Sequence, residues 1–368
     1  MSNLPMILFS FLLSPAFSQS TADFDGNGRV DFADFLSFAG AYGSSETLYD
    51  LDGDGKVEFP DFLVFVQAYQ TENASTDAEP EIVPDEPPAG DPGEPSTITT
   101  SARTEHDLVL VPAGEFTMGS EIGDPKERPI HTVFVSNFRI DRFEVTNLHF
   151  AAFLNAVGEN KDKDGHKLIG LEERYTPEFA FREVQIVQSA TNFSLRDPDT
   201  ANHPVYKVTW YGANAYCEWI GGRLPTEAEW EKAATGTDGR EYPWGNELES
   251  NRANFGGSGD PFDNGTTPVG YFDGSLRGDY QTQDGSSPYG VHDMAGNVWE
   301  WVYDHYDSRY YGSSPLVNPK GPESGNSHSV RGGNWGAIGD DIRTATRDSF
   351  QPEGTSFNLG FRCVLPIK

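Results

Sequence analysis

The chain has 368 residues, 36% of them hydrophobic and 13% aromatic, which is enough for two or three domains and at least one sizeable core. Its formal net charge is −31, and residues 1–105 alone hold 19 acidic residues against 3 basic ones. With no run of Lys or Arg to meet phosphate groups, the composition excludes nucleic acid as a partner and favours cations as ligands.

The first residues, MSNLPMILFSFLLSPAFSQS, combine a short apolar run with the small-x-small sequence Ala16-Phe17-Ser18, although no Lys or Arg precedes the run. This pattern predicts a signal peptide over residues 1–19, and therefore a secreted, periplasmic or cell-surface protein. A disordered or anchoring N-terminus is the alternative. No later segment approaches the roughly 18 consecutive apolar residues of a membrane span, so we expect no transmembrane segment.

Two acidic twelve-residue segments follow, beginning at Asp23 and, 27 residues later, at Asp50. Calcium requires oxygen ligands at positions 1, 3, 5 and 12, a backbone carbonyl at position 7 and a glycine at position 6. The ligands that this spacing predicts are Asp23, Asp25, Asn27, the carbonyl of Arg29, Asp34, Asp50, Asp52, Asp54, the carbonyl of Lys56, and Asp61. Acidic turns that bind no metal are the alternative interpretation.

Each calcium loop leads into apolar residues at helical spacing, and Phe38 and Phe65 belong to the two stripes. Residues 20–70 thus resemble a dockerin, a small all-α module of paired EF-hand loops whose folding depends on calcium. Dockerins bind cohesins through positions 10 and 11, which are Phe32-Ala33 and Phe59-Pro60 here rather than small polar pairs. Docking to a cohesin-like scaffold, a structural calcium module and self-association therefore all remain open.

Residues 71–106 carry six prolines and nine acidic residues with almost nothing bulky to bury, which predicts a disordered linker. Short strands are then expected at 108–112 and 132–135. Capping signals predict three helices, which begin after Thr146, Thr209 and Thr226 and include a capping box with Glu229. The chain from 107 to 368 therefore predicts one mixed α and β domain.

A series of motifs in that domain carries a family resemblance: FTMGS at 116–120, DRFEVTN at 141–147, HPVYKVTW at 203–210, GRLPTEAEWEKAA at 222–234, YPWGN at 242–246, DMAGNVWEW at 293–301, VRGGNW at 330–335 and GFRC at 360–363. The domain resembles the formylglycine-generating enzymes, or sulfatase-modifying factors, which oxidise a cysteine in sulfatases. The resemblance implies an α+β, C-type-lectin-like fold with little regular structure.

The same resemblance exposes a departure. In those enzymes two cysteines between the RGG and a later A-x-R hold copper and carry out the oxidation, whereas residues 334–346 contain no cysteine. The resemblance further implies a disulfide between the only two cysteines, Cys217 and Cys363, which leaves no thiolate for copper(I); two free thiols are the alternative. We therefore expect no copper and no oxidation. An active oxidase of sulfatase cysteines and a scaffold-docked assembly component are the alternatives.

Calcium sites in the large domain are also implied by the resemblance. One ion would be held by Asp293, the carbonyls of Gly296 and Val298, and Glu300, and a second site would begin at Asn254 and Phe255 and end at Asp260 or Asp263. Carboxylate and carbonyl oxygens suit this hard cation. A turn containing Asp162 and Asp164 lacks the acid that a calcium loop has at position 12, so a plain turn is expected there.

Six residues in the segments that build the substrate groove of the catalytic relatives are candidate ligand contacts: Trp299, Trp301, Trp335, Arg331, Arg343 and Arg347. Large aromatic side chains and arginines make effective anchors in binding sites. Glycine-flanked tryptophan in this fold is also often core, so structural packing is the alternative. The sequence thus predicts an exported calcium-binding protein whose large domain binds a protein or a glycan.

Overall fold

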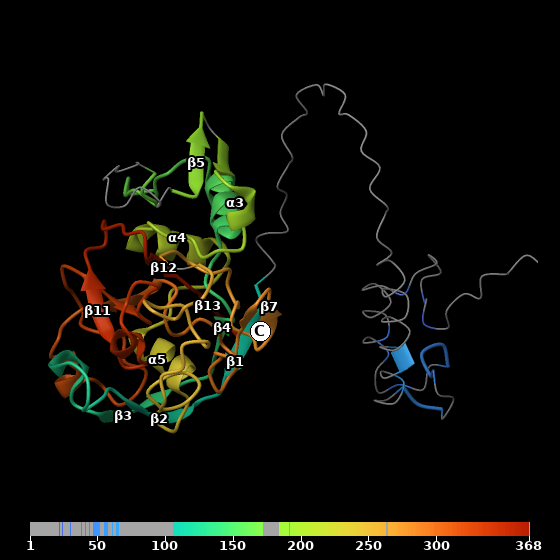
Figure 1. Ribbon diagram of the computed structural model, residues 1–368, viewed down its shortest axis with the longest axis horizontal. Helices are drawn as coiled ribbons and strands as arrows, with labels where there is room; N and C mark the ends of the chain where they lie inside the picture. The colour runs from blue at the N-terminus through green and yellow to red at the C-terminus, as the bar shows by residue number, and fades with distance from the viewer. Residues whose placement is uncertain are drawn as a thin grey trace, which may run out of the picture. The chain divides into compact units, whose positions relative to one another are not determined.

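The computed structural model describes residues 106–171, 184–190, 192–262 and 264–367, together with positions 22, 24, 30, 38, 41, 44, 47–51, 55–57, 61, 64 and 65. Two compact units divide the chain, Met1–Glu94 and Pro95–Lys368 (Figure 1). The expected signal peptide, the linker up to residue 105 and most ligands of the calcium loops lie outside the described residues; those ligands are Asp23, Asp25, Asn27, Arg29, Asp34, Asp52 and Asp54. Within the described part, no helix has both the length and the apolarity needed to cross a membrane.

The described residues of the smaller unit include three phenylalanines in mutual contact. The rings of Phe38 and Phe65 stack with centroids 5.7 Å apart, and Phe24 lies 6.4 Å and 6.0 Å from them. Val30 and Val57 are buried in the clusters beside these rings. The expected contact between the two apolar stripes is therefore present at Phe38 and Phe65.

The larger unit is built on two small sheets (Figure 1). In the four-stranded sheet the order is β11 (Arg347–Phe350), β10 (His328–Arg331), β9 (Trp299–His305) and β12 (Leu359–Phe361). Strand β12 runs parallel to β9, and the other pairs are antiparallel. The three-stranded antiparallel sheet has the order β1 (Leu108–Val111), β4 (Phe138–Asp141) and β13 (Val364–Leu365).

Three two-stranded antiparallel pairs complete the strands of the described chain. They are β2 (Gly114–Met118) with β3 (His131–Val135), β5 (Ile186–Ser189) with β6 (Asn192–Leu195), and β7 (Leu276–Arg277) with β8 (Tyr280–Gln281). Short 3-10 helices cover η3 (Pro125–Glu127), η5 (Pro198–Thr200), η6 (Tyr310–Ser313) and η7 (Gly339–Ile342). Much of the domain is loop, which fits the expected C-type-lectin-like architecture.

The three helices begin where their capping residues predict. Helix α3 (Asn147–Val157) is capped by the Thr146 side chain and stops at Gly158, whose φ of 80° suits glycine. Helix α4 (Trp210–Trp219) is capped by Thr209. Helix α5 (Glu227–Thr235) opens with the predicted capping box, in which Thr226 N–H donates to the Glu229 carboxylate at 2.8 Å. Local sequence thus set all three starts.

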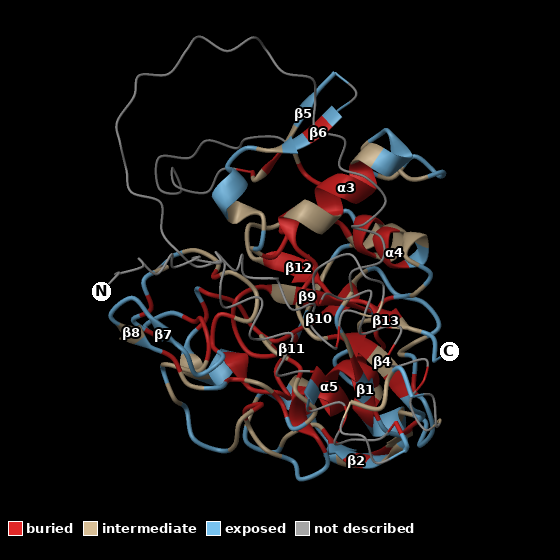
Figure 2. Ribbon diagram, turned by 90° about the vertical axis from the view of Figure 1, so that its right-hand side faces the viewer, coloured by how far each residue is buried: buried red, intermediate tan, exposed pale blue. Residues whose placement is uncertain are grey.

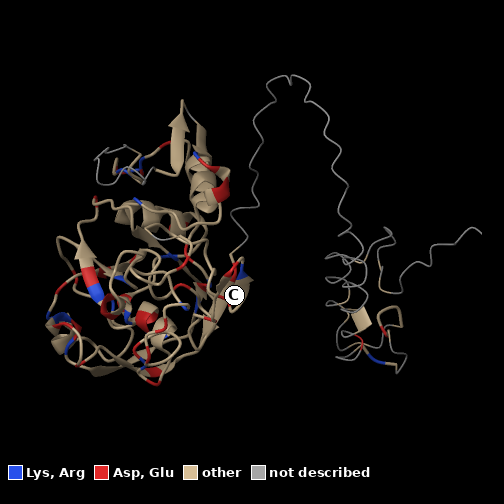
Figure 3. Cartoon of the chain, in the orientation of Figure 1, with Lys and Arg blue, Asp and Glu red and all other residues tan. Residues whose placement is uncertain are grey.

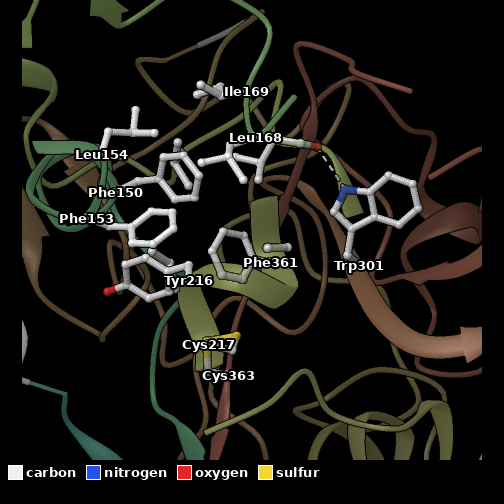
Figure 4. Close-up of a cluster of buried hydrophobic side chains, with 14 of the residues drawn as sticks. Phe150, Phe153, Leu154, Leu168, Ile169, Tyr216, Cys217, Trp301, Phe361 and Cys363 are labelled. Atoms are coloured by element: carbon white, nitrogen blue, oxygen red, sulfur yellow. Dashed lines mark hydrogen bonds between the residues drawn. A yellow bond between two sulfur atoms is a disulfide. The ribbon is translucent and has the colours of Figure 1, made fainter. Parts of the chain in front are cut away.

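A large hydrophobic core lies between α3, α4 and the four-stranded sheet. Figure 4 shows Phe150, Phe153, Tyr216 and Phe361 as one group of rings, with the disulfide beside them. Trp301 extends this core, and its indole N–H donates to the Val208 carbonyl at 2.9 Å. Helix α5 and the central strands of the sheet are buried, whereas β7 and β8 are exposed (Figure 2).

Candidate functional site

The three arginines predicted as ligand anchors are instead partners in internal ion pairs. Arg347 binds the Glu227 carboxylate through two hydrogen bonds of 2.7 Å, and Arg331 contacts both Glu227 and Glu231. The Arg331 guanidinium also donates to the Thr344 carbonyl at 2.7 Å. Both arginines have 0% exposure, so they hold α5 against β10 and β11 and present nothing to a ligand.

Arg343 follows the same pattern nearer the surface. Its guanidinium makes two hydrogen bonds of 2.9 Å to Glu127 at the end of η3. The two residues are 216 positions apart in the chain, so the pair fastens the loop after η7 to the η3 turn. The expectation of three arginine anchors is therefore corrected, because buried carboxylates that the motifs did not identify neutralise all three.

The tryptophans divide between core and surface. Trp301 is fully buried, as the packing alternative anticipates, and Trp335 is 7% exposed. Trp299 is half-buried and lines a pocket of about 670 Å³. Trp335 lines a different pocket of about 590 Å³. Three of the six predicted contact residues therefore border a cavity: Trp335, Trp299 and Arg343, the last of which is paired with Glu127.

The pocket at Trp335, here called the amide pocket, has an uncharged lining. Its walls are Gly256, Gly257, Asn264, Asn334, Trp335, Gly336 and Asn358. The Asn334 side-chain oxygen accepts the Gly336 N–H at 2.8 Å, which fixes the loop where the RGG segment ends. Asparagine amides offer both donors and acceptors, so this pocket suits uncharged polar groups.

The pocket at Trp299, here called the acidic pocket, is bordered by six acidic residues, Asp124, Glu127, Glu241, Asp340, Asp341 and Asp348. Only two basic residues line it, Lys126 and Arg343, and Arg343 is already paired with Glu127. Figure 3 shows adjoining basic and acidic positions on β11. The segment 334–341 contributes to both pockets, and it belongs to the interval in which the catalytic relatives carry their copper-binding cysteines.

Copper held by two thiolates does not fit this chain. Cys217 and Cys363 form a disulfide with Cα atoms 5.5 Å apart, and both are fully buried. The disulfide implied by the resemblance is confirmed, and since the sequence has two cysteines, no thiol remains. The polar residues near the vacated positions, Asp340 and Asp341, offer hard oxygen ligands, which do not stabilise copper(I).

Residues 293–300, the segment expected to bind calcium, form a tight loop beside the Glu144 carboxylate. Glu144 was not among the site residues predicted from the sequence. Glu144 accepts hydrogen bonds from the Asn297 side chain at 2.7 Å and from the Val298 N–H at 3.3 Å. Asp293 accepts the Gly270 N–H at 2.6 Å. Glu144 lies within the DRFEVTN motif, which identified the family but gave no reason to single out this side chain.

The electrostatics of this loop favour a cation. Burial, reinforced by the negative charges of Asp293 and Glu300, raises the pKa of Glu144 well above its usual range. Burial likewise raises the pKa of Asp293. Glu300 is already bound by Arg362 through two hydrogen bonds of 2.7 Å and by the Trp230 indole at 2.9 Å. One guanidinium thus faces three carboxylates, an excess of negative charge that a bound cation would offset.

The second expected calcium segment lies against the first. The Asn254 carbonyl accepts the Asn297 N–H at 2.8 Å, and the Asn254 side chain donates to the Gly265 carbonyl at 2.9 Å. Phe255 is buried, and the Asp260 carboxylate accepts the Phe262 N–H at 2.8 Å, while Asp263 lies outside the described residues. Close by, the buried Thr267 hydroxyl makes no hydrogen bond within the described residues, while the Thr267 N–H donates to the Asn297 side-chain oxygen at 3.0 Å.

Of the second calcium loop in the smaller unit, Asp50, Lys56 and Asp61 are described. The Asp50 carboxylate accepts the Gly55 N–H at 2.8 Å, and the Asp61 carboxylate accepts the Leu51 N–H at 2.7 Å. Gly55 has a φ of 93°, which glycine adopts without strain. The first, sixth and last positions of the loop are therefore arranged around one turn.

Comparison with known proteins places the larger unit in a family. Residues 94–367 match the sulfatase-modifying factor enzyme 1-like domain. The chain is 36% identical over 304 residues to a formylglycine-generating enzyme of Streptomyces coelicolor, covering 75% of this chain and 93% of that one. The chain therefore belongs to the sulfatase-modifying factor, or formylglycine-generating enzyme, family.

Other similarities show how the domain recurs. The chain is 37% identical over 265 residues to the serine/threonine-protein kinase Pkn1 of Chlamydia trachomatis, covering 71% of this chain and 38% of that protein. It thus spans little more than a third of the kinase's length. The structure of PvdO from Pseudomonas aeruginosa is similar with a TM-score of 0.55 and 26% identity, over 70% of this chain and 93% of that one.

Proposed function

We propose that the chain is an exported, calcium-stabilised member of this family that binds a protein ligand and does not oxidise it. The observation that carries the proposal is the state of the sulphur atoms: both cysteines are bridged to each other in the core, and neither lies within residues 334–346. An oxidation that begins at a copper ion on two thiolates has no ligands in this chain. Residues 334–341, in the same interval, help to line two pockets that a ligand could enter.

The lining of the two pockets indicates what the ligand carries. The amide pocket accepts uncharged polar groups, such as peptide bonds or hydroxyls. The acidic pocket, with six carboxylates against two basic groups, favours a cationic group. A protein segment containing Lys or Arg meets both requirements, whereas a neutral glycan meets only the first. We therefore favour a basic protein segment over a glycan.

Calcium in this proposal is structural. The ions would be held by the paired loops of the smaller unit and, in the larger unit, by Asp293, Glu144 and the carbonyls of the 293–300 loop. The Asp50–Gly55 hydrogen bond and the crowded carboxylates around Glu144 support this role. Export is inferred from the signal-like residues 1–19. The proposal gives the smaller unit a structural role only and includes no scaffold partner for it.

The test uses the full chain with saturating calcium. A random peptide library and a glycan array are screened in parallel, and we expect enrichment of peptides containing Lys or Arg. The double variant D340N/D341N should weaken binding about tenfold or more, and added salt should weaken it further. The variant D279N, which changes an exposed aspartate away from the pocket, should bind like the parent chain.

Two outcomes would overturn the proposal. Enrichment of glycans alone, unaffected by D340N/D341N, would assign the surface to another ligand class. Formation of aldehyde on a peptide carrying a sulfatase motif, above a copper-free control, would show that the oxidase reading is right and that some other group replaces the missing thiolates.

A further inference from the structure

A tight turn that lines neither of these two pockets brings together two carboxylates and an imidazole. The turn joins residues that pair as an isolated bridge, Lys161 and Lys167, and it carries Asp162, Asp164 and His166. One potential ligand atom from each of these three side chains lies within 4.8 Å of the others. They are the one group of three or more such side chains that the described residues gather this closely.

Backbone hydrogen bonds hold the turn in shape. One oxygen of the Asp162 carboxylate accepts the N–H groups of Asp164 at 2.9 Å and of His166 at 2.8 Å. The Asp162 N–H donates to the His166 carbonyl at 2.9 Å, and Gly165 adopts a φ of 88°. Asp162 is thus fixed in position.

The imidazole is fixed from the other side. The His166 ring stacks on the Tyr211 ring of α4 with centroids 3.8 Å apart and planes 4° from parallel. Its Nδ1 lies 2.8 Å from the second oxygen of Asp162. Asp164 is exposed and can rotate toward both. A small movement of that one side chain completes a three-ligand set, so little ordering is required on binding.

We propose that Asp162, Asp164 and His166 form a binding site for a borderline divalent transition-metal ion such as Zn²⁺, Co²⁺ or Ni²⁺. The imidazole decides the class of ion, because calcium takes oxygen ligands whereas nitrogen together with carboxylates suits first-row transition metals. Metal–nitrogen and metal–oxygen bonds of about 2.0–2.2 Å bring such ligands together at this spacing. The sequence predicted a turn without a metal here. His166 supplies the nitrogen ligand that makes transition-metal binding the better interpretation.

The site opens onto a pocket. A cavity of about 730 Å³ is lined by all three side chains together with Tyr211, Asn214 and Trp219 of α4. Three protein ligands leave at least one coordination position to water or to an oxygen donor of a bound molecule, as in metal sites that act on ligands. This inference is independent of the proposed function, since neither the amide pocket nor the acidic pocket contributes a residue.

The experiment titrates Co²⁺ into the full chain under saturating calcium, so that the calcium loops are occupied. The parent chain is compared with H166Q, with D164N, and with the matched control D279N. We expect the parent and D279N to bind one Co²⁺ with visible d–d absorption bands, and H166Q and D164N to bind it at least tenfold more weakly. Zn²⁺ should displace the ion and bleach the bands. Equal binding and equal spectra in all four proteins would overturn the proposal.

Folding is checked separately, because His166 and Asp164 lie at the surface and their replacement should leave the domain intact. Near-ultraviolet circular dichroism of the variants should match the parent chain. Paramagnetic broadening by Co²⁺ gives a second readout: Tyr211 ring signals should broaden in the parent chain and not in H166Q. Broadening centred on any other residue in the parent chain would place the ion elsewhere and contradict the assignment.

Discussion

Arg347 at the start of β11 and Glu227 at the start of α5 form a two-pronged ion pair, with both nitrogen–oxygen distances at 2.7 Å and both side chains withdrawn from solvent. Burial by itself disfavours the charged carboxylate. The positive charges of Arg347 and Arg331 nevertheless hold the pKa of Glu227 below its ordinary value. The pair therefore connects helix to sheet at the position where the sequence suggested a ligand anchor.

Replacing Arg347 with Met should destabilise the domain by about 3 kcal/mol, because a buried carboxylate loses its principal partner while Arg331 compensates in part. The control R309M removes an arginine that is 91% exposed and lies 3.9 Å from Asp307, and should change stability by less than about 0.5 kcal/mol. Urea unfolding followed by tryptophan fluorescence measures both. Equal midpoints for R347M and R309M would refute the structural role of the pair.

The disulfide gives a second prediction. Closing a loop with a sequence separation of 146 contributes on the order of 4–5 kcal/mol in the chain-entropy model, so C217A/C363A should lose a comparable amount. Both sulphur atoms are buried, and reductant should therefore reach them only after unfolding. Thiol titration after dithiothreitol treatment should count no thiols in buffer and two in urea. Two reactive thiols in the untreated native chain would contradict the structure.

Local signals in the sequence were sufficient for the starts of the three helices, and the family resemblance implied the disulfide partners. Thr146, Thr209 and Thr226 cap helices because a side-chain oxygen can satisfy free N–H groups one turn away, which needs no knowledge of the rest of the chain. The family motifs likewise indicated the fold. Each of these inferences depends on neighbours within a few positions or on a motif as a whole.

Whether each arginine is buried in an ion pair depends on residues that are distant in the sequence. Arg343 meets Glu127 across 216 positions and Arg347 meets Glu227 across 120, so whether either faces solvent is decided by tertiary structure. The same holds for Glu144, which reaches the calcium segment across 153 positions to Asn297. The residue types at these positions predicted charged side chains. Whether each side chain is buried in an ion pair or exposed to a ligand was determined by the tertiary structure.

Stability should fall in acid through His328. Burial, together with the nearby His305, lowers the pKa of His328 to about 4 in the folded chain, against about 6.5 when unfolded. The unfolded chain therefore binds the proton first, so the stabilisation is complete above about pH 6.5 and is lost as the pH falls toward 4, by on the order of 3 kcal/mol. The measurement is urea unfolding at several pH values across this window.

The variant H328F keeps a ring to stack on Trp210, whose ring centroid lies 4.0 Å from that of His328. Because phenylalanine does not titrate, the number of protons taken up on unfolding between pH 4 and 6.5 should fall by about one. Y303F is the matched control, because His328 bonds the backbone carbonyl of Tyr303 and not its side chain, which is exposed. Its pH dependence should match the parent chain. An H328F curve parallel to the parent curve would assign the acid sensitivity to other groups.

The effect of the D293N substitution on the free energy of unfolding should change sign when calcium is added. Without calcium, Asp293 crowds Glu144, so D293N should leave stability unchanged or raise it. With calcium at a hundredfold excess over its dissociation constant, the parent chain should gain about 2.7 kcal/mol, and a tenfold loss of affinity in D293N would remove about 1.4 kcal/mol of that gain. Asparagine tolerates the φ of 58° at this position, so the exchange tests charge rather than backbone strain.

All seven tryptophans lie between residues 210 and 335, so their fluorescence reports on the larger unit and not on the calcium loops of the smaller one. The control D279N should respond to calcium like the parent chain, and an equal calcium response in D293N would remove Asp293 from the proposed site.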